Sequence, residues 1–124
     1  MIIKIPFKTP TTNLMYATFN GNRVKSKQAR ELSKEVKEIM LNSKYKIIEG
    51  ELDVTIEIHS NWYNKDKTIK KRDIANLEKF ITDSIFENLK DMDDRQIFKL
   101  TMWKIQSDEE FAKVEIKQLV DKLK

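Results

Sequence analysis

The sequence predicts a single-domain α+β fold over residues 1–124, in the order β-α-β-α-β-β, with two helices packed on a small mixed or antiparallel sheet. Three observations support this prediction. A chain of 124 residues is long enough for one domain with one hydrophobic core. Two segments repeat apolar residues at helical spacing, and four others have strand-like apolar patterns. Only two Gly and two Pro interrupt these patterns, so periodicity has to place the elements.

The first half of the chain predicts a strand, a long loop and a helix. The apolar run at 2–7 indicates a strand, which Pro10 ends. Residues 9–22 are polar and end in Asn-Gly-Asn, which predicts a long loop with a turn near its end. Such a loop in so small a domain is more often functional than idle. Apolar residues at helical spacing then predict a helix from an N-cap at Ser26 to about Asn42.

The second half predicts three strands around one helix. Residues 52–59 alternate apolar and polar side chains, which is typical of a strand with one buried face. A hydrophilic loop at 60–72 precedes a helix over 74–90, for which Asp73 occupies the N-cap position. Strands are then expected at 96–106 and 110–118, joined by a turn. This order of elements predicts helices packed against one sheet.

Charge and composition exclude few functions. The formal net charge is +4, and the first 50 residues carry ten Lys and Arg against four Asp and Glu. A basic half can attract a polyanion and an acidic half can hold a cation, but charge alone favours an ordinary dispersed domain. No apolar run is long enough to span a bilayer, and the N-terminus is typical of a strand rather than a signal peptide. The absence of cysteine is consistent with a cytoplasmic protein.

Acidic residues are the first candidates for chemistry. Asp73 opens the second helix, and the Asp93-Asp94 pair lies in the connection that leaves it. Carboxylates at the ends of adjacent elements can meet in space, and Mg²⁺ prefers a few such oxygens plus water and substrate phosphate. Taken singly, however, Asp73 is also an ordinary helix cap and the aspartate pair an ordinary solvated turn. Lys79 and Asp83 face away from the core, where they could form a surface ion pair or stabilise charge on a phosphate.

The loop after the long strand combines aromatic and basic residues. Trp62 and Tyr63 are followed by five cations, which could contact DNA phosphates while the aromatic rings stack on unpaired bases. Alternatively, both rings turn back over the core and the cations are simply solvated. The residue types do not choose between these two interpretations. The five basic residues are Lys65, Lys67, Lys70, Lys71 and Arg72.

Taken together, these motifs closely resemble the signature of the RusA family of Holliday-junction resolvases. The resemblance rests on the run from Arg72 to Lys79, then Asp83, then the run from Asp93 to Ile97. The family signature has two aspartates that flank one residue, an Asn, a lysine three residues later, a helical aspartate and an Asp-Asp pair before Gln. A weaker resemblance covers residues 13–31 and matches a mobile N-terminal loop in that family.

The resemblance implies a homodimer that cuts four-way DNA junctions with Mg²⁺ or Mn²⁺. It implies that Asp73 and Asp94 bind the metal, with Asp93 as a further neighbour, and that Lys79 is a catalytic cation. Asn76 and Asp83 would be supporting residues. The implied DNA-binding residues are Lys65, Lys67, Lys70, Lys71 and Arg72 in the second loop, and Asn13, Tyr16, Arg23 and Lys25 in the first.

One position departs from the family signature. Ala75 stands where the second aspartate is expected, and a methyl group cannot bind a cation. The sequence therefore predicts impaired cleavage. Three explanations are open: a deliberate replacement, a natural pseudoenzyme, or a site that uses Asp93 or another carboxylate. The intact neighbouring motif favours the first.

Two functions without cleavage remain open beside the nuclease. The chain could grip branched DNA without cutting it, or it could use the same surface to bind another protein. A dimer is expected from the strand at 97–105, which carries apolar residues on both faces and needs a cover that a partner subunit could supply.

Overall fold

The computed structural model describes residues 1–120, and it confirms the α+β class. Sheet strands and helices appear where the periodicity predicts them, and further short elements precede the first long helix. The elements in chain order are β1 (Ile2–Ile5), α1 (Thr12–Met15), β2 (Tyr16–Phe19), β3 (Asn22–Lys25), α2 (Lys27–Leu41), β4 (Leu52–Ser60), α3 (Ala75–Phe86), the 3₁₀ turn η1 (Asp94–Gln96), β5 (Ile97–Gln106) and β6 (Phe111–Gln118).

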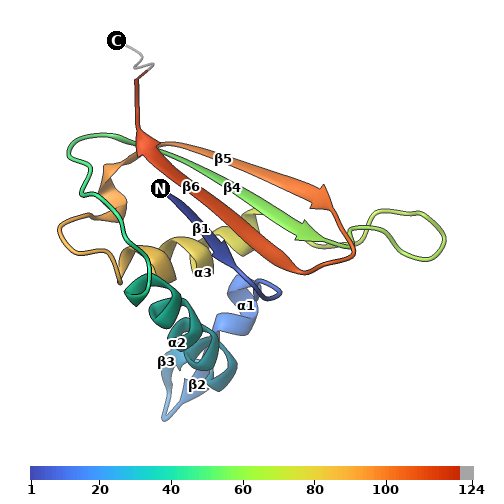
Figure 1. Cartoon of the computed structure of the whole chain (residues 1–124). Coiled ribbons are helices and arrows are strands. Elements are labelled where there is room, and N and C mark those ends of the chain that lie inside the picture. Colours follow the sequence, from blue (N-terminus) through green and yellow to red (C-terminus); the bar gives the residue numbers. More distant parts are fainter. Residues whose placement is uncertain (121–124) are drawn as a thin grey trace.

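Four strands form one mixed sheet in the order β1-β6-β4-β5. The pairs β1–β6 and β4–β6 are antiparallel, whereas β4 and β5 run parallel. A parallel pair needs a crossover connection, and here α3 provides it. The helices lie on one side of this sheet, and the loop at 60–72 extends beyond the C-terminal end of β4 (Figure 1). None of the helices in the described part of the chain has the length and apolar character needed to cross a membrane.

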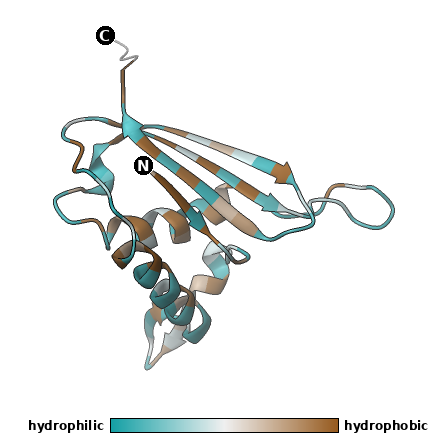
Figure 2. Cartoon of the chain, viewed as in Figure 1, coloured by the Kyte–Doolittle hydropathy of each residue, from teal (hydrophilic) through white to brown (hydrophobic). Residues whose placement is uncertain are grey.

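The core lies between α3 and the inner face of the sheet. Ile56 on the central strand and Phe80 on α3 are both fully buried. The helix is hydrophobic over most of its surface, while α2 and the loop at 60–72 are largely hydrophilic (Figure 2). The two polar residues Thr82 and Ser84 are also buried, so α3 exposes only a narrow ridge to solvent. Any chemistry on α3 must therefore use that ridge.

The predicted N-terminal loop at 9–22 is wrong in part, because it contains structure. Thr11 caps the short helix α1, and β2 and β3 pair as an antiparallel hairpin. Asn20 and Gly21 both have positive φ, which is the backbone that a tight two-residue hairpin turn requires. The predicted cap at Ser26 is confirmed, because its hydroxyl accepts a hydrogen bond from the Ala29 amide at 3.1 Å.

The helix predicted over 74–90 is shorter than expected at its C-terminus. It ends at Phe86, and the Asn88 and Leu89 amides bond three residues back, which tightens the chain into a turn. Asp91 then adopts a positive φ. Leu89 is still buried, but in the turn rather than on the helix. The apolar pattern therefore persisted past the last helical residue.

The expected N-cap at Asp73 is also wrong. The residue next to the helix is Ile74, which already has helical backbone angles and makes no side-chain cap bond. Asp73 contributes its carbonyl instead, which accepts from the Asn76 amide at 3.0 Å. Its carboxylate is therefore not used for capping, and it stays exposed.

Strand β5 is one of the two edge strands of the sheet, opposite β1. Its backbone pairs with β4 on one side only. Phe98, Leu100 and Trp103 are 69%, 41% and 55% exposed along this strand. None of the three helices within residues 1–120 covers these side chains completely, and the dimer stays a prediction.

Candidate functional site

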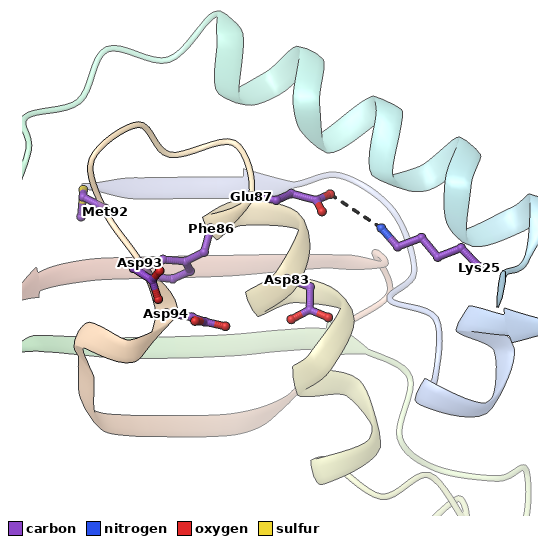
Figure 3. A pocket seen from close by; sticks show the side chains of 7 residues that line it. All are labelled: Lys25, Asp83, Phe86, Glu87, Met92, Asp93 and Asp94. Carbon is purple, nitrogen blue, oxygen red and sulfur yellow. Dashed lines mark ion pairs between the residues drawn. The ribbon is translucent and has the colours of Figure 1, made fainter. Parts of the chain in front are cut away.

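Acidic side chains converge at the C-terminal half of α3. Asp83 projects from the exposed ridge of the helix, and Asp94 projects from η1 toward it (Figure 3). Both line a hollow of about 310 Å³, together with Asp93 from the same turn. Lys25 and Glu87 close one end of this hollow. The structure thus brings together Asp83, Asp93 and Asp94, three of the aspartates singled out in the sequence.

The position of the aspartate pair follows from how η1 is capped. The Asp93 carboxylate accepts from the Arg95 amide at 2.8 Å, and the Gln96 side chain accepts from the Asp93 amide at 2.7 Å. These two bonds form a reciprocal capping box. The Gln96 amide group also donates to the carbonyls of Ile48 and Gly50, which anchors the turn to the segment before β4.

The electrostatics of the hollow disfavour a fully ionised cluster. The pKa of Asp94 lies above its usual value, first because its carboxyl shares a hydrogen bond with that of Asp93, then because of slight desolvation and the negative charges of Asp93 and Asp83. The pKa of Asp93 is lowered, chiefly by the hydrogen bond from the Arg95 amide. Carboxylates that repel one another in this way are well suited to binding a cation.

Lys79 lies one turn before Asp83 on the same ridge. Its ammonium group is 3.3 Å from the Asp83 carboxylate. The charge and hydrogen bond of Asp83 raise the pKa of Lys79, and Tyr16 adds a smaller effect in the same direction. Lys79 is therefore a stable cation beside the acidic hollow.

The N-terminal segment forms a wall along the ridge of α3. The Thr12 hydroxyl donates to the Asn76 carbonyl at 3.1 Å, and the Lys25 ammonium lies 3.7 Å from the Glu87 carboxylate. Between these two contacts lies Tyr16, whose phenol contributes to the raised pKa of Lys79. The N-terminal segment thus contacts the ridge near both of its ends. The Arg23 guanidinium lies over the Tyr16 ring, 4.2 Å from its centroid.

Asp73 and Ala75 lie at the other end of the ridge. Both are exposed, and neither lines the acidic hollow. Position 75 is eight residues before Asp83, which is about 12 Å along a helix axis. Within residues 1–120, no three His, Cys, Asp or Glu side chains lie close enough to hold one metal ion together. The family signature is therefore spread along one ridge, with Lys79 between its two acidic ends.

The loop after β4 separates its two aromatic residues. Trp62 is only 3% exposed, and its indole N–H donates to the carbonyls of Ile58 and Ile105. The Arg72 guanidinium and the Lys104 ammonium lie 4.8 and 4.9 Å from the Trp62 ring. Tyr63, by contrast, is 44% exposed. The core interpretation therefore holds for Trp62, and only Tyr63 is free to stack on a base.

The cations of this loop also differ from one another. The Arg72 guanidinium donates to the Ser60 hydroxyl at 3.0 Å besides packing on Trp62, so its charge is partly used within the protein. Lys65 and Lys70 line a hollow of about 430 Å³ with Tyr63, Asn61 and Asn64. Lys67 and Lys71 are exposed. Four lysines and one tyrosine are thus available on this loop.

Glu87 is an acidic residue of the hollow that the sequence analysis did not single out. It lies four residues after Asp83, so it falls on the same ridge of the helix. The same spacing links Asp83 to Lys79. Extending that series by one more turn would have identified it.

The domain has carboxylates beside a lysine, and basic segments lie next to them. These are features of a protein that hydrolyses nucleic acids. Comparison with known families places the chain among the endodeoxyribonucleases. A family model described as endodeoxyribonuclease RusA matches residues 6–117, which is most of the chain. The chain belongs to this family, whose members act on branched DNA junctions. No curated protein matches the chain.

Proposed function

We propose that the chain is a structure-selective endodeoxyribonuclease that cuts four-way DNA junctions with Mg²⁺ or Mn²⁺, and that Ala75 weakens its cleavage. The observation that carries the proposal is the convergence of Asp83 and Asp94 in one hollow beside Lys79. Family membership supplies the substrate class. A chain that processes recombination or repair junctions works where the DNA is, so we propose a cytoplasmic location.

The residues present fit a hard divalent ion. Mg²⁺ keeps several of its waters and needs only one or two protein carboxylates plus substrate phosphate. Asp94 and Asp83 supply two such carboxylates, with Asp93 adjacent. A bound ion would also relieve the repulsion that raises the pKa of Asp94. We therefore propose Asp94 as the main ligand, with Asp83 or Asp93 as the second.

The roles of the other residues follow from their positions on the ridge. A bound divalent ion would polarise the phosphate and lower the pKa of an attacking water. Lys79, held by Asp83, is placed to stabilise the negative charge that develops on the phosphate or the leaving oxygen. Asn76 lies one turn before Lys79, and its carbonyl holds Thr12 of the N-terminal wall. We propose that Asn76 is a supporting residue of the site.

Asp73 and position 75 form the second acidic end of the ridge. The distance of about 12 Å to Asp83 is close to the rise of three or four nucleotides at 3.4 Å each. We propose that this end binds a cation at a phosphate three or four nucleotides away on the same strand. With Ala75 it retains only Asp73, so the cation is held more weakly and cleavage falls.

A homodimer is the simplest form for this activity. A four-way junction has two strands to cut symmetrically, which matches two sites related by a twofold axis. The free edge of β5 and its exposed Phe98, Leu100 and Trp103 provide a surface for a second copy. We propose that this edge carries the dimer contact.

The decisive experiment is a nicking assay on a labelled four-way junction. The parent chain, with Ala75, and its Ala75→Asp variant are compared with Mg²⁺ and with Mn²⁺. We expect weak or no cleavage by the former and clear cleavage by the latter. Equal cleavage by both would show that Ala75 is no defect and that Asp83 and Asp94 suffice. Binding without cleavage by either variant, on any junction sequence, would leave a non-catalytic branched-DNA-binding module.

A further inference from the structure

A second hollow adjoins the acidic one and has the opposite charge. It measures about 250 Å³ and lies between α2 and the C-terminal end of α3. Four cations line it: Lys25 from the hairpin and Arg30, Lys34 and Lys37 from α2. Glu87 is the only acidic residue in its lining. We refer to this hollow as the basic groove.

The charges of α2 are sorted by side. Arg30, Lys34 and Lys37 recur at spacings of four and three residues, so they form one ridge along the helix. Three glutamates, Glu31, Glu35 and Glu38, form a separate ridge on the neighbouring side. Figure 2 shows the hydrophilic character of this helix against the hydrophobic α3.

The cations of the basic ridge carry charge that no neighbour neutralises. All three are exposed. Among residues 1–120 none of them is within ion-pair distance of a carboxylate, although the glutamate ridge lies beside them. The Ser33 hydroxyl is buried in the wall of the same groove and has no hydrogen-bond partner there. Such a groove is attractive to a polyanion.

The basic groove is continuous with the acidic hollow. Lys25 and Glu87 line both of them, and their ion pair marks the boundary (Figure 3). A strand that passes over Asp83 and Asp94 toward Glu87 therefore meets the cations of α2 next. The acidic hollow by itself would repel phosphates, so DNA needs a neighbouring surface of positive charge to be held there.

We propose that the basic groove binds the backbone phosphates of one duplex arm of the junction, next to the acidic hollow. The inference rests on the proposed function and extends it to α2, outside the motif residues. Arg30 and Lys37 are seven residues apart, about 10 Å along the helix, which is the rise of about three nucleotides. The groove thus contacts about three phosphates, and these contacts are independent of base sequence.

The first test is the salt dependence of junction binding. The triple variant Arg30→Gln, Lys34→Gln, Lys37→Gln removes three positive charges from the groove. Its matched control, Lys44→Gln, Lys46→Gln, Lys117→Gln, removes the same number from a hollow formed by other residues. Loss of three phosphate contacts should flatten the slope of log affinity against log salt by about 2.7. Between 50 and 200 mM salt the groove variant should therefore lose about 40-fold less affinity than the parent.

The control variant is expected to keep the slope of the parent. An equal change in both triple variants would mean that net charge alone matters, and it would overturn the proposal. So would a groove variant with the affinity and slope of the parent. Circular dichroism and thermal unfolding of each variant show that the fold is retained, because all six side chains are at the surface.

The second test uses the absence of cysteine in the chain. Lys34→Cys and, as a control, Lys46→Cys each provide one attachment site for an iron-EDTA cleavage reagent. Lys34→Cys should cut the DNA at a few adjacent nucleotides of one arm, close to the crossover. Lys46→Cys should give no such local cleavage. Uniform cutting from both positions would overturn the proposal.

These outcomes separate the inference from the proposed function. If the parent binds or cuts junctions while the groove variant behaves like it, the basic groove is not the arm site and the nuclease proposal stands. If the parent shows no junction binding at all, both fail together. The tests require only DNA binding, so they work with Ala75 in place.

Discussion

The ammonium group of Lys79 lies 3.3 Å from the carboxylate of Asp83, one turn further along the solvent-facing ridge of α3. The pair contributes little to folding, because exposed pairs at this helical spacing are worth about 0.3 to 0.5 kcal/mol. Its position beside Asp94 gives it a different importance. It holds a cation at the edge of a cluster of carboxylates, where a scissile phosphate would lie.

Lys79→Ala should separate stability from activity. In the Ala75→Asp background we expect junction cleavage to fall by about 10²- to 10³-fold, as for loss of one group that stabilises transition-state charge. The free energy of unfolding should change by less than about 0.5 kcal/mol. Single-turnover nicking and urea unfolding measure the two quantities. A large loss of stability would mean that Lys79 acts through folding.

Divalent ions should stabilise the chain through Asp94. A ligand that binds only the folded state raises the free energy of unfolding, by about 1.4 kcal/mol at ten times its dissociation constant. We expect Mn²⁺ to raise the melting temperature of the parent and to have no effect on Asp94→Asn. Asp108→Asn, in the turn before β6, is the matched control and should respond like the parent. Equal stabilisation of both variants by Mn²⁺ would place the ion elsewhere.

Asp94→Asn should also be at least as stable as the parent without metal. The raised pKa of Asp94 means that its ionised form is disfavoured in the folded chain at neutral pH, mainly through its interaction with Asp93. A neutral amide removes that repulsion. Thermal unfolding at pH 7 in the presence of a chelator measures the effect. A clear fall in melting temperature would show that the carboxylate is structurally required.

Neutralising the loop cations should have two different effects. Lys70→Gln with Lys71→Gln should weaken binding to all DNA shapes and flatten the salt slope by about 1.8, with the fold unchanged. Arg72→Gln should instead lower the free energy of unfolding by about 1 to 3 kcal/mol, because it loses the Ser60 hydrogen bond and the contact with Trp62. Chemical unfolding distinguishes them. If Arg72→Gln leaves stability unchanged, its contacts are incidental.

Charge on the free edge of β5 should break the dimer. Leu100→Lys with Trp103→Lys puts two cations where we propose that a second copy packs, and edge lysines oppose strand-to-strand association. Light scattering at micromolar concentration should report a dimer for the parent and a monomer for this variant. Leu41→Lys, at an exposed position on α2, is the control and should remain dimeric. A parent that is monomeric at this concentration contradicts the dimer.

Periodicity predicted the elements that bury a face, and it did not predict the elements that bury little. The sheet strands and both long helices follow apolar patterns. The start of α2 was predicted from Ser26, whose hydroxyl can cap a helix. Strands β2 and β3 have four residues each and almost no buried side chains, so no alternation marks them. The local signal was the Asn20-Gly21 pair. It predicted a turn, but it did not predict the strands on either side of that turn.

The sequence predicted most residues of the acidic hollow, but it did not predict which of them lie close together. The spacing along α3 relates Lys79 to Asp83 by one helical turn. The meeting of Asp83 with Asp94 depends on where η1 folds back, and that is set by hydrogen bonds from Gln96 to a segment nearly 50 residues away. No local pattern encodes such a contact. Asp73, which the sequence grouped with Asp94, does not line the hollow in which Asp94 lies.

The hydrogen bonds and the Arg72 contact of Trp62, which we call the clamp, restrain the loop that begins next to this residue. Both ends of the loop are attached to the sheet, through the indole N–H at one end and the Arg72–Ser60 bond at the other. Within the loop, Asn64 and Thr68 bond to each other through their backbones and side chains. The lysines thus lie on a loop that is held at both ends and internally. The conformational entropy of this loop is already lost when the protein folds. A pre-organised loop loses less entropy when it binds DNA. A substitution that loosens the clamp should therefore lower the affinity for DNA although it removes no charge.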